Sequence, residues 1–176
     1  ILLLVALAGC GGNAAVPAPR TFDLGFSAPG ARLPALRVAS LRAVAPFDGV
    51  QMHYRLAWRN PSELADYAHS RWAAPPAELI RKQLLRAVGE GVAKCGLEIE
   101  LQEFTQVFAS SEASEARIEL RVSLVNSSTR LAARGVTIVE PGSGTDAASG
   151  AAAIARATER VLGDLAAWVS ARPECR

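Results

Sequence analysis

The chain has 176 residues, of which 50% are hydrophobic and 20% are charged, a composition that suits one globular domain with a substantial core. Its 19 basic and 17 acidic residues leave a net charge of +2, which is too balanced to indicate nucleic-acid binding. It has two histidines, and no Cys or His pair has the spacing of metal ligands, so we expect neither a metal site nor a cofactor.

The first residues, ILLLVALAGC, form an apolar run about half as long as the roughly 20 residues of a membrane-spanning helix. We expect residues 1–9 to be the remnant of a secretory signal peptide whose charged start precedes Ile1. Leu7-Ala8-Gly9-Cys10 has the pattern of a bacterial lipobox, so we expect Cys10 to be lipidated and to anchor the chain. Gly11, where an Asp favours inner-membrane retention in enteric bacteria, favours the outer membrane.

The segment after the anchor predicts a tether and then the first strands. Residues 10–20 are rich in Gly, Pro and Ala and predict a flexible tether, which leaves residues 21–176 as one domain. A short strand is expected over Thr21–Leu24. Apolar alternation and β-branched residues predict strands over 36–44 and 50–58, and the turn between them suggests a hairpin.

The middle of the chain predicts a helix after an irregular stretch. Residues 60–74 show no regular pattern, and Pro75-Pro76 then suits a helix start. Leu84, Val88 and Val92 recur at helical spacing, so the helix is predicted over 76–94.

The last third predicts three strands and a second helix. Alternating residues over 97–109, 116–125 and 130–140 predict an antiparallel meander, and a final helix is expected over 147–171 after a flexible loop. The fold class is therefore mixed α/β, in which two main helices pack on a mixed sheet that ends in the meander.

Three local features of the meander accompany this prediction. The apolar side changes near Phe104, which indicates either a bulge or burial of both faces. Gly135 is a candidate bulge or close-approach point. The third feature is a charged face of the predicted meander. The simplest interpretation is a solvated face with cross-strand ion pairs, and the alternative is a docking surface. The residues of this face are Glu98, Glu100, Arg117, Arg121 and Arg134.

Cys95 and Cys175 remain once Cys10 is assigned to the lipid. Because a secreted protein meets an oxidising compartment, we expect a disulfide between them that holds the C-terminus, with two free thiols as the alternative.

Candidate reactive residues are few, and we expect no enzyme. His53 and His69 lack an obvious Ser or Asp partner in the sequence. Tyr67, Arg71 and Trp72 lie just before the first helix, where two interpretations are open. They form either an interface hot spot or a hinge in which Trp72 is buried against the helix start.

Residues 46–84, PFDGVQMHYRLAWRNPSELADYAHSRWAAPPAELIRKQL, resemble the ABC-type transport auxiliary lipoproteins, the family of paraquat-inducible protein C-like lipoproteins. The lipobox, Phe22-Asp23-Leu24 and the terminal Trp168-Val169 extend the resemblance over nearly the whole mature chain. Its most specific part is Tyr67–Leu79, whereas Pro61 departs from the usual turn.

The resemblance implies a non-catalytic lipoprotein that works with an ABC transporter and an Mce-domain protein to move lipids between membranes. The domain would face the periplasm from its anchor at Cys10 and dock on the Mce protein, with Tyr67, Arg71 and Trp72 as expected contacts. A ring-shaped Mce partner would be compatible with a homo-oligomer.

Two alternatives stay open at this point. The first is a lipoprotein that itself binds a lipid or small apolar ligand between sheet and helices. The second is a periplasmic hydrolase that uses His53 or His69.

Overall fold

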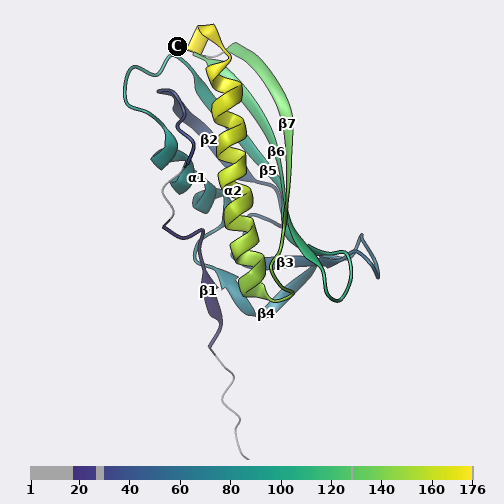
Figure 1. The fold of residues 1–176 in the computed structure, drawn as a ribbon. Helices are drawn as coiled ribbons and strands as arrows, with labels where there is room; N and C mark the ends of the chain where they lie inside the picture. The colour runs from purple at the N-terminus through teal and green to yellow at the C-terminus, as the bar shows by residue number, and fades with distance from the viewer. Residues whose placement is uncertain (1–17, 27–29, 128, 176) are drawn as a thin grey trace, which may run out of the picture.

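A computed structural model describes residues 18–26, 30–127 and 129–175 (Figure 1). Residues 1–9, predicted as a signal-peptide remnant, and Cys10, predicted to be lipidated, lie outside the described residues. The elements are β1 (Arg20–Phe22), β2 (Arg37–Ala43), β3 (Gln51–Leu56), β4 (Ala65–Trp72), α1 (Pro76–Ala87), β5 (Gly96–Phe108), β6 (Ser114–Asn126), β7 (Thr129–Pro141), α2 (Ala147–Ser170) and a closing 3₁₀ turn (Pro173–Cys175).

The strands form one seven-stranded sheet, which confirms the predicted mixed sheet and adds β4, a strand that the sequence did not predict. Its order is β1-β4-β3-β5-β6-β7, and β2 pairs with β5 beside β3. β6 is antiparallel to both of its neighbours, β5 and β7, which confirms the predicted meander. β2 and β3 are both parallel to β5, and β1 is parallel to β4.

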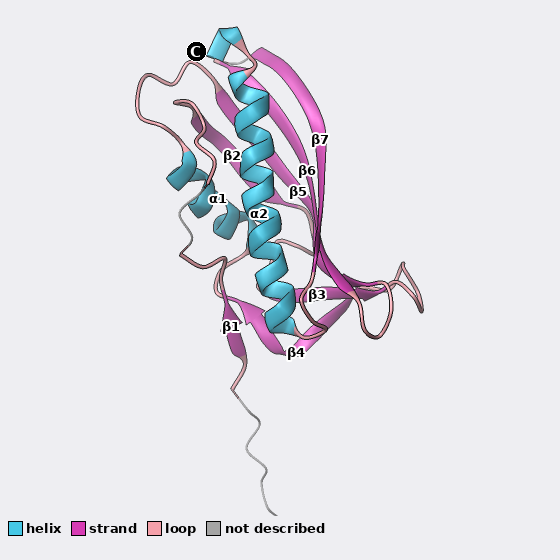
Figure 2. Ribbon diagram, viewed as in Figure 1, coloured by secondary structure: helices cyan, strands magenta, loops and turns pink. Residues whose placement is uncertain are grey.

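Both helices pack on the same face of the sheet (Figure 2). α2 crosses β5, β6 and β7 and buries Ile154, Val161 and Leu165, which share one side of the helix. Asp146 caps its start by accepting a hydrogen bond from the Ser149 amide at 2.8 Å. α1 lies beside β2 and buries Ile80 and Leu84. No helix among the described residues is long and apolar enough to span a bilayer.

The predicted hairpin of residues 36–44 and 50–58 is wrong. β2 pairs with Gly96–Leu101 of β5, whereas β3 pairs with Thr105–Phe108 of the same strand. The long central strand therefore takes both segments as parallel neighbours, one on each half of its length.

The predicted helix over 76–94 ends early, at Ala87. Val88 turns to an extended conformation, and the Gly89 amide donates a hydrogen bond of 2.9 Å to the Leu33 carbonyl. This short pairing competes with the next helical turn, and Val92 is 87% exposed as a result. Residues 60–74 contain β4, whose pairing with β3 shifts register and so hides the period-two pattern.

Two expectations for the meander are also corrected. Gly135 pairs with Arg121 in unbroken register, and a Cβ there would meet nothing within 4 Å. It is therefore neither a bulge nor a close-approach point. Arg134 does not share the open face, because its guanidinium bonds to Asp164 of α2 and lies 5.0 Å from the Trp168 ring centroid.

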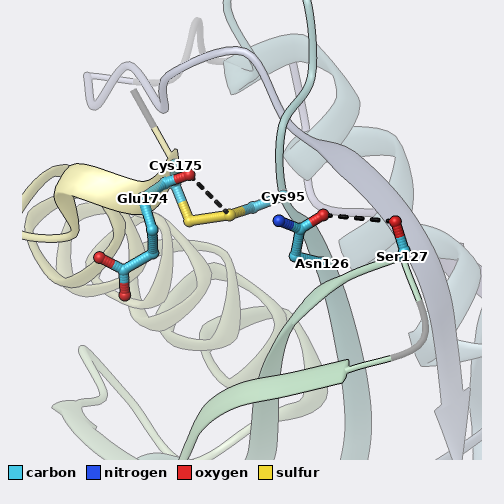
Figure 3. The surroundings of a disulfide bond; sticks show 5 residues. All are labelled: Cys95, Asn126, Ser127, Glu174 and Cys175. Atoms are coloured by element: carbon cyan, nitrogen blue, oxygen red, sulfur yellow. Dashed lines mark hydrogen bonds between the residues drawn. A yellow bond between two sulfur atoms is a disulfide. The ribbon is translucent and has the colours of Figure 1, made fainter.

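A disulfide joins Cys95 to Cys175, the pair expected from the sequence (Figure 3). It links the residue just before β5 to the closing 3₁₀ turn, and the Cα atoms are 5.2 Å apart. Both cysteines are buried, so the C-terminal turn is fixed against the start of the central strand.

We predict that replacing both cysteines by alanine lowers the free energy of unfolding by about 4 kcal/mol, since the bond closes a loop of 80 residues in the unfolded chain. Urea unfolding of the two proteins, each without reductant, measures the difference. Adding dithiothreitol to the unmodified protein should reproduce the loss and leave the double variant unchanged. Equal stability of the two proteins would contradict a structural role for the bond.

Candidate functional site

The candidate site is a surface groove of about 360 Å³ at the ends of β3 and β5. We call it the aromatic groove. It is lined by Tyr54, Leu56, Trp58, Tyr67, Phe108, Ser110, Ser111 and Thr145.

Strand pairing brings the aromatic rings together. Tyr54 and Leu56 lie opposite Gln106 and Phe108 of β5, and Tyr67 comes from β4 on the other side of β3. The Tyr54 ring centroid lies 4.8 Å from that of Tyr67 and 5.9 Å from that of Phe108. Such contacts stabilise ring pairs in offset or edge arrangements, so the rings support one another at the surface.

Trp58 forms the exposed rim of the aromatic groove. It follows the end of β3 in a turn, and 53% of its surface is accessible. The Arg59 guanidinium lies 5.8 Å from its ring centroid. A large exposed aromatic beside an arginine is a typical anchor of a protein interface.

A buried polar network supports the groove from inside. The Tyr67 hydroxyl donates to Gln106 Oε1 at 2.7 Å, and Gln106 Nε2 donates to Ser114 Oγ at 2.8 Å. The Ser114 hydroxyl donates in turn to the Gly144 carbonyl at 2.6 Å. A Cβ at Gly150 of α2 would lie 2.1 Å from Gln106 Oε1, so a larger residue there would displace the Gln106 side chain from this network.

Burial raises the pKa of Tyr67 above its ordinary value, with smaller contributions from Tyr54 and Asp146. The hydroxyl therefore stays protonated at neutral pH and remains a hydrogen-bond donor to Gln106. Tyr67 is thus held in one orientation, and its ring is presented to the groove.

The structure separates the three residues predicted as partner contacts. Tyr67 lines the aromatic groove. Trp72 is only 2% exposed, and its ring centroid lies 5.3 Å from that of Phe104 in the core. Its expected role as a contact is therefore corrected: it packs the interior at the end of β4. Arg71 is exposed on the opposite side of β4 from Trp72 and does not line the groove.

His53 has partners that sequence reasoning missed. Its Nδ1 lies 2.5 Å from Asp66 Oδ1, and its Nε2 lies 3.1 Å from the Pro46 carbonyl oxygen. The ring is 8% exposed and meets Phe47 edge-on. One ring nitrogen thus links β3 to β4 and the other links β3 to the loop that precedes it, while His69 is exposed. The described residues contain no group of three His, Cys, Asp or Glu side chains that could hold a metal.

The open face of the sheet carries charged pairs, as the solvated-face interpretation expects. Arg42 of β2 pairs with Glu100, and Arg55 of β3 donates to Glu103 at 2.9 and 3.1 Å. Both pairs cross from a neighbouring strand to β5.

Comparison with known proteins finds likeness in structure. No family model and no curated protein matches the chain. Protein XCC0632 from Xanthomonas campestris, which carries the family designation DUF330, has 26% identity and a TM-score of 0.64 over 81% of this chain and 93% of its own. An uncharacterized protein with 11% identity has a TM-score of 0.65 over 87% of this chain and 99% of its own, which shows the shared fold. A candidate lipoprotein from Caulobacter crescentus has 19% identity and a TM-score of 0.38 over 55% of this chain and 85% of its own.

The two tryptophans just described should respond differently to truncation. We predict that Trp72→Ala lowers the free energy of unfolding by about 3–5 kcal/mol because it leaves a cavity in the core. Trp58→Ala, at an exposed rim, should change it by less than about 0.5 kcal/mol. Chemical denaturation measures both values, and similar losses in the two variants would contradict the assignment of core and rim.

Tyr67→Phe tests the buried network. Removing the hydroxyl leaves Gln106 Oε1 without its donor, so we predict a loss of about 1–2 kcal/mol at pH 7. The folded-state pKa of Tyr67 lies above its unfolded value, so its contribution is complete below about pH 10 and is lost as pH rises through the folded value. Urea unfolding from pH 7 to 11 should show the two proteins converging in stability above pH 10. A difference that stays constant would rule out this linkage.

Proposed function

We propose that this protein is a non-catalytic lipoprotein of the bacterial envelope that assists an ABC transporter and an Mce-domain protein in moving lipids between membranes. It is anchored through Cys10, faces the periplasm, and docks on the Mce protein through the aromatic groove. Gly11 after the anchor favours the outer membrane.

The main support for the proposal is the order of features along the chain. A lipobox, Leu7–Cys10, is followed by a Gly- and Pro-rich tether and then by one mixed α/β domain. The segment Tyr67–Leu79 resembles the auxiliary lipoproteins in its most specific part. Within it, Tyr67 lines the aromatic groove and Trp72 packs the core, so the segment joins a surface to the interior.

The aromatic groove supports a docking role because of its chemistry. Trp and Tyr side chains with a nearby arginine are enriched among the residues that dominate binding energy in interfaces. Trp58 supplies such a residue at the rim, and Tyr67 is oriented by its hydrogen bond to Gln106. A rigid aromatic surface loses little conformational entropy when a partner covers it.

The non-catalytic part of the proposal is supported by the surroundings of His53. A general base needs a free nitrogen that can reach a nucleophile or a substrate. Here one ring nitrogen faces Asp66 and the other faces the Pro46 carbonyl, and the ring is buried. The hydrolase alternative therefore finds no support at this histidine.

The ligand-carrier alternative needs room between sheet and helices. In the described part of the chain, large buried side chains occupy that space, including Phe104 of β5, Leu84 of α1 and Ile154 of α2. This packing favours a docking protein over a carrier.

A crosslinked pull-down tests the proposal. The tagged full-length lipoprotein is recovered from detergent-solubilised membranes of its own organism, beside the variants Trp58→Ala and Leu85→Ala. Leu85, on α1, is 53% exposed like Trp58 and lies outside the groove, so it is a matched control. We predict that the unmodified protein and Leu85→Ala recover an Mce-domain protein with ABC subunits, and that Trp58→Ala recovers at least about tenfold less, a loss of about 1.4 kcal/mol or more.

Two outcomes would count against parts of the proposal. Equal recovery by all three proteins would keep the transporter role and remove the aromatic groove as the docking surface. Recovery of no transporter component, under conditions that preserve other envelope complexes, would overturn the role itself.

A further inference from the structure

The edge of β7 that faces away from β6 has no neighbouring strand in the part of the chain that the structure describes. β7 is the last strand in the order and pairs with β6 in regular register from Ala132 to Pro141. In an antiparallel ladder, alternate residues direct both backbone groups away from the partner strand. The Val139 and Pro141 carbonyls accept hydrogen bonds from α2, so these odd-numbered residues face the free edge.

One end of this edge is covered. Arg160 Nη1 donates to the Val139 carbonyl at 2.7 Å, and Arg156 Nη2 donates to the Pro141 carbonyl at 2.7 Å. Proline also lacks the outward N–H at position 141. The two arginines bind Glu140 as well, so this end is closed by a salt-bridge network.

The adjoining stretch is open. Ala133, Gly135 and Thr137 alternate in step with Val139, so their backbone N–H and C=O groups also point away from β6. All three residues are exposed. These backbone groups have no hydrogen-bond partner among the described residues. Their side chains are small, and the position of a Gly135 Cβ is empty to 4 Å. An incoming strand could therefore approach the backbone of β7 at hydrogen-bonding distance.

The other free edges of the sheet are shorter or less regular, and the part of β4 that β1 does not reach, residues 65–69, lies at the register shift with β3. β1 has only three residues, and β2 is interrupted by a register shift between Val38 and Ser40. Short and bulged edges are common protections against unwanted pairing. The regular, uncovered stretch of β7 therefore differs from the edges that the fold protects.

The charges around the open stretch select the kind of strand that fits. Arg121 lies directly opposite Gly135 on β6, and Arg130 lies at the start of β7. Neither has a carboxylate partner among the described residues. Glu98 and Glu100 share the open face but lie on β5, one strand farther from the free edge; Glu100 is opposite Arg121 and pairs with Arg42. Glu119, opposite Thr137, is taken by Arg117.

A second copy of this chain fits the edge less well. Antiparallel pairing about Gly135 would place Arg130 of one copy near Glu140, Arg156 and Arg160 of the other. Each end would then hold three arginines and one glutamate, and the glutamate is already bound by two of the arginines. Like charges facing each other across strands are destabilising.

We propose that Ala133–Thr137 of β7 is a docking edge that binds an extended, acidic segment of a partner protein as an additional strand. The outward backbone groups of Ala133, Gly135 and Thr137 supply the hydrogen bonds, and Arg121 and Arg130 pair with carboxylates of the added strand. This inference does not depend on the transporter role.

Two variants of Gly135 test whether a partner strand binds through the backbone of β7. Gly135→Pro removes one outward N–H and leaves every bond to β6 in place, because the inward groups belong to the even-numbered residues. Gly135→Ala keeps that N–H and places its methyl group in open space. If Gly135→Pro fails to fold by circular dichroism, Thr137→Pro removes another outward N–H at the same edge.

The probe is the synthetic peptide Val-Glu-Val-Thr-Val-Glu-Val, with a counterpart in which Lys replaces both Glu residues. It is titrated into the full isotope-labelled chain in detergent micelles, and amide exchange is followed by NMR. We expect the acidic peptide to slow exchange at Ala133, Gly135 and Thr137. We expect binding to be weaker by about tenfold or more for the Lys peptide and for Gly135→Pro, and to change less than about threefold for Gly135→Ala.

Three results would overturn the proposal. Protection that appears elsewhere, or at none of the three amides, would remove the edge as a site. Equal affinity for the two peptides would remove the selection for acidic strands. A concentration-dependent dimer that forms without peptide and is abolished by Gly135→Pro would assign the edge to a second copy.

Discussion

The fold depends on a bulge in the central strand β5. The pairing with β6 shifts between Leu101 and Glu103, so that one extra residue, Gln102, enters the strand. Before the bulge the odd-numbered Leu97, Ile99 and Leu101 face the helices, and after it the even-numbered Phe104 and Phe108 do so. Without the shift, the second half of the strand would turn its phenylalanines to the charged face.

The same bulge explains why β5 has two parallel neighbours. β2 pairs with its first half up to Leu101, and β3 pairs with its second half from Thr105. Because the bulge bends β5 between these two pairings, the two halves of one 13-residue strand can each pair with a different parallel strand. The aromatic groove follows from this, since Tyr54 and Leu56 meet Gln106 and Phe108 only where β3 lies beside the second half.

The sequence predicted the elements whose signals are local. The meander and the last helix have continuous alternation or helical spacing, and both appear close to the expected bounds. The change of side near Phe104 was also visible as a break in the alternation, and the structure realises both alternatives: a bulge precedes Phe104, while Thr105 on the other face is 0% exposed.

Long-range pairing decided the features that the sequence missed. The parallel pairing of β2 with β5 leaves no local signal, so two strands joined by a turn suggested a hairpin. The early end of α1 depends on a contact with Leu33, more than fifty residues away by sequence (Leu33 to Val88). For the site, alternation placed Tyr54 and Trp58 on one face, but it could not show that no helix covers that end of the sheet. The partners of His53 were missed for the same reason, because Asp66 lies on a strand that was not predicted.

The sheet order relates the proposed anchor to the open edge. The predicted tether leads into β1, and β1 and β7 are the two ends of the strand order. The ten residues from Cys10 to Pro19 span at most about 35 Å when extended, so a lipid on Cys10 would hold the β1 end of the sheet near the membrane. β7 would then be the part of the sheet farthest along the order from the anchor, with its open stretch free to pair with a partner. The proposed anchor and the proposed docking edge thus belong to different edge strands, so a strand added at β7 would not displace β1.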